Sequence, residues 1–182
     1  MIINIYGPSG SGKTTFIRKL LLLDSTQKFF RKYSNENSKD NLNNRTSISL
    51  MPIPLFRGTV KEFFDIFGIN IKNLLNLNRE FKDLAQSIFG KINSNLLNEI
   101  ASRRIETLSA GEIRRLFILK SILVESNLVI IDEPFSNSDE KLWRKIYDSI
   151  KLKERSIILS HFSLQKFFDS SKNDISIHIN DI

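Results

Sequence analysis

The chain has 182 residues, 41% hydrophobic and 26% charged, which is typical of one globular domain and excludes a largely disordered or fibrous chain. Apolar stretches such as Leu20–Leu23 and Leu128–Ile131 are far shorter than the ~20 residues that span a bilayer, so we expect no membrane anchor. The absence of cysteine excludes disulfides, thiolate metal sites and a cysteine nucleophile. The net charge of +7 is compatible with phosphate, anionic lipid or nucleic-acid partners, although scattered solvated lysines are the simpler interpretation. No secretory leader is visible, and we expect a cytoplasmic protein.

The first part of the chain predicts a strand, a turn and a helix. Residues 2–6 form a short apolar run, a Gly/Ser-rich turn follows, and residues 13–23 show a wide apolar face at helical spacing. The polar stretch 31–46 predicts a surface loop, and residues 47–51 predict a second strand that ends at Pro52.

The remainder predicts helices and then alternating strands and helices. Residues 60–105 repeat apolar positions at helical spacing and predict three or four short helices, whose phenylalanines we interpret as core rather than as a docking surface. We expect helices over 110–124, 140–152 and 163–170, and strands over 128–132, 156–160 and 175–179. This order predicts an α/β fold with a mainly parallel sheet and an inserted helical part.

A phosphate-binding loop is the strongest motif. The turn between the first strand and helix matches G-x-x-x-x-G-K-[ST] at every fixed position. Glycines let successive backbone N–H groups point at one phosphate, and the helix N-terminus adds a positive dipole end. In this pattern Lys13 reaches the β- and γ-phosphates and Thr14 ligates Mg²⁺. The alternative is a Gly-rich turn that binds nothing. The motif residues are Gly7, Pro8, Ser9, Gly10, Ser11, Gly12, Lys13 and Thr14.

Two carboxylates follow the apolar strand 128–132. Asp132 and Glu133 stand at the C-terminal edge of a predicted parallel strand, where an open α/β sheet places its ligand. We therefore expect Asp132 beside the phosphate loop, holding Mg²⁺ directly or through water, and Glu133 polarising an attacking water. A plain strand end is the alternative.

These motifs together with three others resemble the ATP-binding-cassette ATPases. Leu108–Glu112 (LSAGE) resembles the family's signature sequence, and Asp132–Phe135 (DEPF) looks like its Walker B end. Ser136–Asp139 stands where the family has its D-loop, and His161 matches its switch histidine. The motifs occur in the family's order and cover most of the chain.

The resemblance implies a P-loop NTPase, an α/β fold whose mainly parallel sheet is flanked by helices and interrupted by a helical subdomain. It implies one domain over 1–182, with the core at 1–59 and 109–182 and the subdomain at about 60–108. It further implies binding and hydrolysis of ATP with Mg²⁺, a homo- or heterodimer that closes head-to-tail around two ATPs, and a separate transmembrane permease at the cytoplasmic side of the membrane. Nucleic acid is an unlikely partner on this interpretation.

The resemblance also assigns site residues. Phosphates bound by one subunit's loop, including Thr15, would meet Ser109 and Gly111 of the other subunit, and His161 would contact the γ-phosphate. Glu133 and Lys13 complete the catalytic set. Ser109 also forms a capping-box pattern with the acid three residues later, so a plain helix cap is an alternative. A histidine at a strand end is often only a surface residue.

Two departures from the family pattern are visible. Ile53 stands where the family has a glutamine, and six residues precede Gly7, whereas the family's adenine-stacking aromatic lies well upstream; Tyr33, Phe29 or Phe30 are candidate substitutes.

Three other functions remain open. One is a reduced, nucleotide-binding regulatory cassette with weak turnover. Another is a cassette ATPase acting on nucleic acid, although no sustained heptad run is present. A small P-loop kinase fits the length but lacks a visible arginine-rich lid.

Overall fold

The structure is a computed structural model. It describes the following parts of the chain: residues 1–23, 26–33, 46–50, 56–71, 86, 94–136, 139–153, 155–167 and 174–182.

Five parallel strands form one sheet. They are β1 (Ile2–Tyr6), β2 (Thr46–Ser49), β3 (Leu128–Asp132), β4 (Arg155–Ser160) and β5 (Ile175–His178), in the spatial order β2-β3-β4-β1-β5. Every pairing between neighbouring strands is parallel, so the C-terminal ends meet at one edge. The predicted mainly parallel α/β sheet is confirmed, and the strands β1, β3 and β4 that carry the predicted motifs are neighbours.

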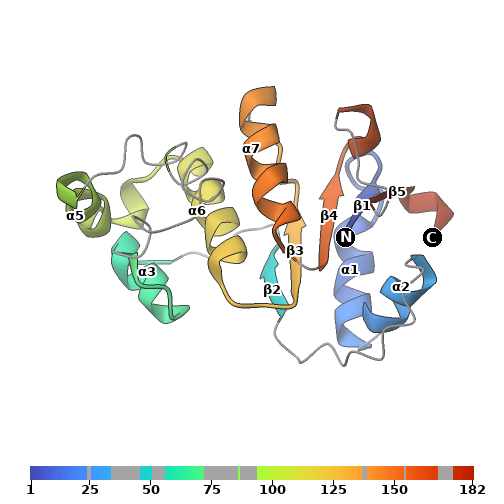
Figure 1. The fold of residues 1–182 in the computed structure, drawn as a ribbon, viewed down its shortest axis with the longest axis horizontal. Helices are drawn as coiled ribbons and strands as arrows, with labels where there is room; N and C mark the ends of the chain where they lie inside the picture. The colour runs from blue at the N-terminus through green and yellow to red at the C-terminus, as the bar shows by residue number, and fades with distance from the viewer. Residues whose placement is uncertain are drawn as a thin grey trace.

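Helices cover both faces of this sheet (Figure 1). One face packs on α1 (Lys13–Leu22) and α2 (Thr26–Tyr33), and the other on α6 (Ala110–Leu123) and α7 (Glu140–Lys151). Alternate strand residues point to opposite faces. The first core therefore contains Ile3, Ile5, Ile17, Leu20, Ile130 and Leu159, and the second contains Ile2, Val129, Ile131, Leu116, Ile146 and Ile158.

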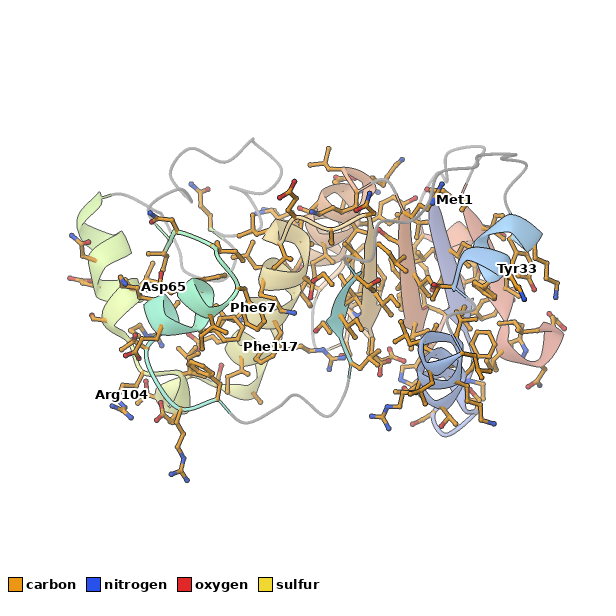
Figure 2. The ribbon with its side chains drawn as sticks, turned by 90° about the horizontal axis from the view of Figure 1, so that it is seen from below. Met1, Tyr33, Asp65, Phe67, Arg104 and Phe117 are labelled. Carbon is orange, nitrogen blue, oxygen red and sulfur yellow. The ribbon has the colours of Figure 1, made fainter. Side chains whose placement is uncertain are left out.

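A helical part lies at the end of the molecule away from α1 (Figure 1). It contains α3 (Val60–Ile66), α5 (Ser94–Ser102) and the 3₁₀ helix η2 (Ile105–Thr107). Phe63 is buried and contacts the rings of Phe67 and Phe117 at 5.2 and 4.9 Å, which joins α3 to α6. Figure 2 shows Phe67 and Phe117 in this part, with Tyr33 at the opposite end of the molecule. The phenylalanines of α3 are thus core, as interpreted, while the limits of a helical subdomain at 60 and 108 stay a prediction.

The structure corrects several local predictions. Residues 31–33, predicted as loop, end the helix α2, because Thr26, Phe29 and Tyr33 at helical spacing pack on the first core. The strand predicted over 47–51 is β2 and ends at Ser49. Of the helix predicted over 163–170, only the 3₁₀ helix η3 (Leu164–Lys166) forms within the described residues. A second 3₁₀ helix, η4 (Ile179–Asp181), directly follows β5.

Within the described ranges, no helix combines the length and the apolar character needed to cross a bilayer.

Candidate nucleotide-binding site

The loop after β1 connects the sheet to the N-terminus of α1. The N–H of Gly7 donates to the carbonyl of Ser160 at 3.1 Å, so the loop leaves the sheet beside the end of β4. Gly10 and Gly12 have positive φ angles of 77° and 92°, which L-residues with side chains rarely adopt. Gly12 precedes α1 in the left-handed conformation, and its carbonyl accepts from Phe16 N at 2.8 Å. The turn thus exposes the first backbone N–H groups of α1, which favour an anion.

Lys13 lies beneath this loop. Its side chain is only 6% exposed, and Nζ donates to the carbonyls of Gly7 and Pro8 at 2.7 and 2.9 Å. Nζ also lies 3.9 Å from Oε1 of Glu133. The lysine charge is therefore held between the loop and the end of β3.

Thr14 and Asp132 meet at the same place. The Thr14 hydroxyl donates to Oδ2 of Asp132 at 2.9 Å, although the two residues are 118 positions apart. Asp132 ends β3 and is buried. A hydroxyl and a carboxylate are hard oxygen donors of the kind that Mg²⁺ prefers, usually together with substrate phosphates. The residues present therefore fit a magnesium ion at this edge of the sheet.

Glu133 lies close to Lys13 and His161. Its Oε1 is 3.3 Å from Nε2 of His161, which is half exposed, and faces Lys13 on the other side. Burial raises the pKa of the Glu133 carboxyl above its usual value, whereas His161 and Lys13 act in the opposite direction. A carboxylate at the edge of a phosphate site is a residue type that can accept a proton from water.

The predicted signature residues lie elsewhere. Ser109 caps α6: its hydroxyl accepts from Glu112 N at 3.3 Å, and its N–H donates to Oε2 of Glu112 at 2.9 Å, which lowers the pKa of Glu112. The capping box is therefore present, and Ser109 is exposed above it. In Figure 1, α6 and α1 lie on opposite sides of β3 and β4.

The other predicted residues differ in exposure. Pro8, Ser9, Gly10 and Thr15 are exposed along the loop and α1. Ser11 Oγ is buried and has no hydrogen-bond partner in the described parts of the chain. Phe29 is buried, with rings of Phe16 and Tyr33 at 5.5 and 5.1 Å, and so offers no free face for a base. Ile53 and the D-loop residues 137–138 lie outside the described residues, and of Phe30 only the backbone in α2 is described.

Arg114 joins this site without having been predicted. It lies on α6, one turn after Ser109, and its Nη2 donates to the carbonyl of Glu133 at 2.6 Å. The signal for it in the sequence is an arginine pair at 114–115, just before the apolar run 116–119.

Comparison with known proteins identifies the family. A family model described as ABC transporter matches residues 1–136, and the chain therefore belongs to the ABC transporter family.

Two curated relatives and one solved structure illustrate the likeness. The zinc import ATP-binding protein ZnuC of Wigglesworthia glossinidia brevipalpis is 30% identical over 169 residues, which cover 88% of this chain and 64% of that protein. The manganese transport system ATP-binding protein MntB of Bacillus subtilis is 26% identical over 194 residues, covering 100% and 74%. The archaeal ribosome recycling factor aABCE1, solved with the ribosomal stalk protein aP1, superposes with a TM-score of 0.58.

These matches cover different shares of the two chains compared. The chain spans less than two thirds of the length of the first of these relatives. The aABCE1 structure is 22% identical, with 88% of this chain and 28% of that chain covered, and shows the fold alone. The predicted P-loop α/β fold and the resemblance to the ATP-binding-cassette family are thus confirmed.

Proposed function

We propose that the chain binds and hydrolyses ATP with Mg²⁺ and thereby powers a separate transmembrane permease. The observation that carries the proposal is the convergence of Lys13, Thr14, Asp132, Glu133 and His161 at one edge of the sheet. Membership of the ABC transporter family and the printed names of the relatives, which are ATP-binding proteins of import systems, support the same function.

In this proposal the loop holds the phosphates of ATP. Backbone N–H groups at the start of α1 and the ammonium of Lys13 compensate the phosphate charge, since both lie at the loop that follows β1. Thr14 and Asp132 would hold Mg²⁺, which supplies neutralisation of charge on the phosphate oxygens when it is bound.

Glu133 is the residue that activates water. A water oxygen attacks the γ-phosphorus, the bond between that phosphorus and the β–γ bridging oxygen breaks, and ADP and inorganic phosphate leave. The proton of the water moves toward the Glu133 carboxylate, while Lys13 and His161 stabilise negative charge beside it.

The finer assembly follows the resemblance. Ser109 and Gly111 of a second subunit would contact the phosphates in a head-to-tail dimer, as the resemblance to the ATP-binding-cassette family implies. The partner is a permease in a separate chain, with this subunit on the cytoplasmic face of the membrane. Closing and opening of the dimer would drive the permease.

Turnover of the purified chain tests the proposal. We expect Mg²⁺-dependent hydrolysis of ATP, and a kcat lower by roughly 10²- to 10⁴-fold in Glu133→Gln, since general base catalysis contributes about that factor. Glu140→Gln, an exposed carboxylate-to-amide change at the start of α7, is the matched control and should leave kcat unchanged. Equal kcat in wild type and Glu133→Gln would contradict hydrolysis at this site and favour a regulatory nucleotide-binding role.

The permease is tested separately. When the chain is solubilised from membranes together with a multi-span protein encoded beside it, the two should co-purify, and reconstitution should change the ATPase rate of the chain. Failure of the pair to co-purify, with turnover intact, would reject the transport partner and not the ATPase.

A further inference from the structure

The turn that carries Glu133 has an unusual backbone. Glu133 has a φ of 50°, and in the described parts of the chain it is the one non-glycine residue with a positive φ. L-residues with side chains are disfavoured in this left-handed region, so the surrounding structure has to hold the turn in place. In this conformation of the turn the Glu133 carboxylate reaches both Lys13 and His161, at 3.9 and 3.3 Å.

Several hydrogen bonds hold the turn from different sides. The N–H of Glu133 donates to the carbonyl of Leu159 on β4 at 2.8 Å. Its own carbonyl accepts from Ser136, through the backbone N–H at 3.2 Å and the hydroxyl at 3.1 Å. These bonds come from neighbouring residues and from the adjacent strand, and so belong to the sheet edge itself.

Arg114 adds a charged donor from a different element. Its Nη2 donates to the carbonyl of Glu133 at 2.6 Å and to the carbonyl of Asp132 at 3.3 Å, and the side chain is partly buried. The bond to Glu133 is short, as expected where a guanidinium is the donor. Because α6 begins at the Ser109 cap, Arg114 connects the first turns of α6 to Asp132 and Glu133 at the end of β3 in the same chain.

We propose that Arg114 is a positioning residue for Glu133, which holds the left-handed turn so that the carboxylate stays between Lys13 and His161. This role rests on the proposed ATPase function, and Arg114 touches neither substrate nor reacting atoms in it. Loss of the guanidinium should leave the phosphate loop intact, because Lys13 bonds the loop carbonyls of Gly7 and Pro8 and Thr14 bonds the Asp132 carboxylate, whereas Arg114 bonds backbone carbonyls. The turnover step should therefore suffer while nucleotide binding is kept.

The experiment compares four forms of the full chain: wild type, Arg114→Met, Arg114→Lys and Arg155→Met. Arg155 begins β4 at the end of the strand away from the site, so its variant is a charge-matched control. For each form we would measure kcat and KM for ATP, the affinity for Mg·ATP, and amide hydrogen exchange. In Arg114→Met we expect kcat to fall at least tenfold, with KM and affinity within twofold of wild type. Arg114→Lys, which keeps a charged donor, should recover part of kcat, and Arg155→Met should behave as wild type.

Amide exchange separates this role from general support of the fold. The N–H groups of Glu133 and Ser136 should exchange faster in Arg114→Met, whereas those of β1 should keep their protection, since β1 pairs only with β4 and β5. Loss of protection across the whole sheet, or a KM that changes as much as kcat, would overturn the positioning role. Unchanged exchange at Glu133 and Ser136 would overturn it whatever the turnover. Absence of hydrolysis by wild type, with these two amides still loosened in Arg114→Met, would reject the proposed function alone.

Discussion

The phosphate loop and the start of α6 are built in opposite ways. At the loop, side chains far apart in the sequence touch directly, as Thr14 and Asp132 do across 118 positions. At the start of α6 the contacts are local: Ser109 bonds Glu112, and Glu112 pairs with Arg103 at 3.2 Å. The first region depends on the whole sheet being folded, whereas the second is a helix cap with an exposed serine.

The two regions therefore offer different chemical groups to a nucleotide. The loop edge brings together the ammonium of Lys13, the oxygen donors of Thr14 and Asp132, and the carboxyl of Glu133, whose pKa burial raises. These groups suit the binding of a triphosphate with its magnesium ion. The Ser109 cap at the start of α6 presents an exposed hydroxyl and backbone N–H groups. Substitutions in the two regions should therefore separate nucleotide binding from dimer contact.

The largest effect on nucleotide affinity should come from the lysine beneath the loop. Lys13→Met keeps much of the buried stem but removes the ammonium that bonds Gly7 and Pro8. Charge-assisted hydrogen bonds contribute about 1.5–3 kcal/mol, so we expect affinity for ATP to fall roughly 10- to 150-fold. Isothermal titration calorimetry would measure it, with Lys19→Met on the exposed side of α1 as the control. Equal affinity in Lys13→Met and wild type would show that the loop does not carry the phosphates.

A smaller effect should follow from a charge at the cap. Aspartate is as good an N-cap as serine, but here it would stand beside Oε2 of Glu112, which accepts from the Ser109 hydroxyl at 2.8 Å, so Ser109→Asp should lower the stability of α6 slightly. It also places a carboxylate where the proposed dimer brings the other subunit's phosphates, so we expect turnover and ATP-dependent dimerisation to fall about tenfold. Light scattering and ATPase assays would measure both. Full dimerisation by Ser109→Asp would contradict the head-to-tail arrangement.

The two helix caps allow the capping role of Ser109 to be separated from its proposed contact with phosphate. The chain has a second capping box, in which Thr59 accepts from Glu62 N at the start of α3. Ser109→Ala and Thr59→Ala should each lower the free energy of unfolding by about 1 kcal/mol. Only Ser109→Ala should also lower turnover, as compared by urea denaturation and ATPase assay. If Thr59→Ala lost as much turnover as Ser109→Ala, the role of Ser109 would be that of a helix cap alone.

The smallest effect concerns Lys120, which ties α6 to the edge strand. Its Nζ donates to the carbonyl of Ile48 at 3.0 Å and lies 4.9 Å from the Phe67 ring centre. Burial lowers the pKa of Lys120 to about 8.

The sign of its pH dependence follows from that pKa. Between about pH 8 and the usual lysine value near 10.4, the unfolded chain binds more protons at this residue than the folded chain. Its contribution to the free energy of unfolding therefore rises with pH across this range. Urea denaturation at pH 7.5 and 9.5 should show that Lys120→Met lacks part of the rise seen in wild type. An identical rise in both forms would contradict a depressed pKa.

Much of the site could be predicted because its residues belong to motifs with fixed spacing in the sequence. The loop residues follow one pattern, and Asp132 ends an apolar run whose parallel strand has to finish at the ligand edge. The meeting of Thr14 with Asp132 followed from these two facts. The left-handed backbone of Glu133 could not be predicted, since it depends on bonds to β4 and α6.

The fold shows the same limit. The apolar strands were recognisable, but α2 was missed because its few apolar positions, such as Phe29, lie among polar neighbours and only their packing on the sheet reveals a helix. Arg114 was missed for a related reason: its partners are backbone carbonyls, which leave no trace in a residue pattern.

The convergence of the loop and the acidic strand end on one magnesium-bound nucleotide is most directly tested by calorimetric titration of ATP with and without Mg²⁺. Wild type should bind ATP more tightly when Mg²⁺ is present, and Asp132→Asn should lose most of that difference while keeping Mg²⁺-free binding. The same gain from Mg²⁺ in wild type and Asp132→Asn would contradict the account.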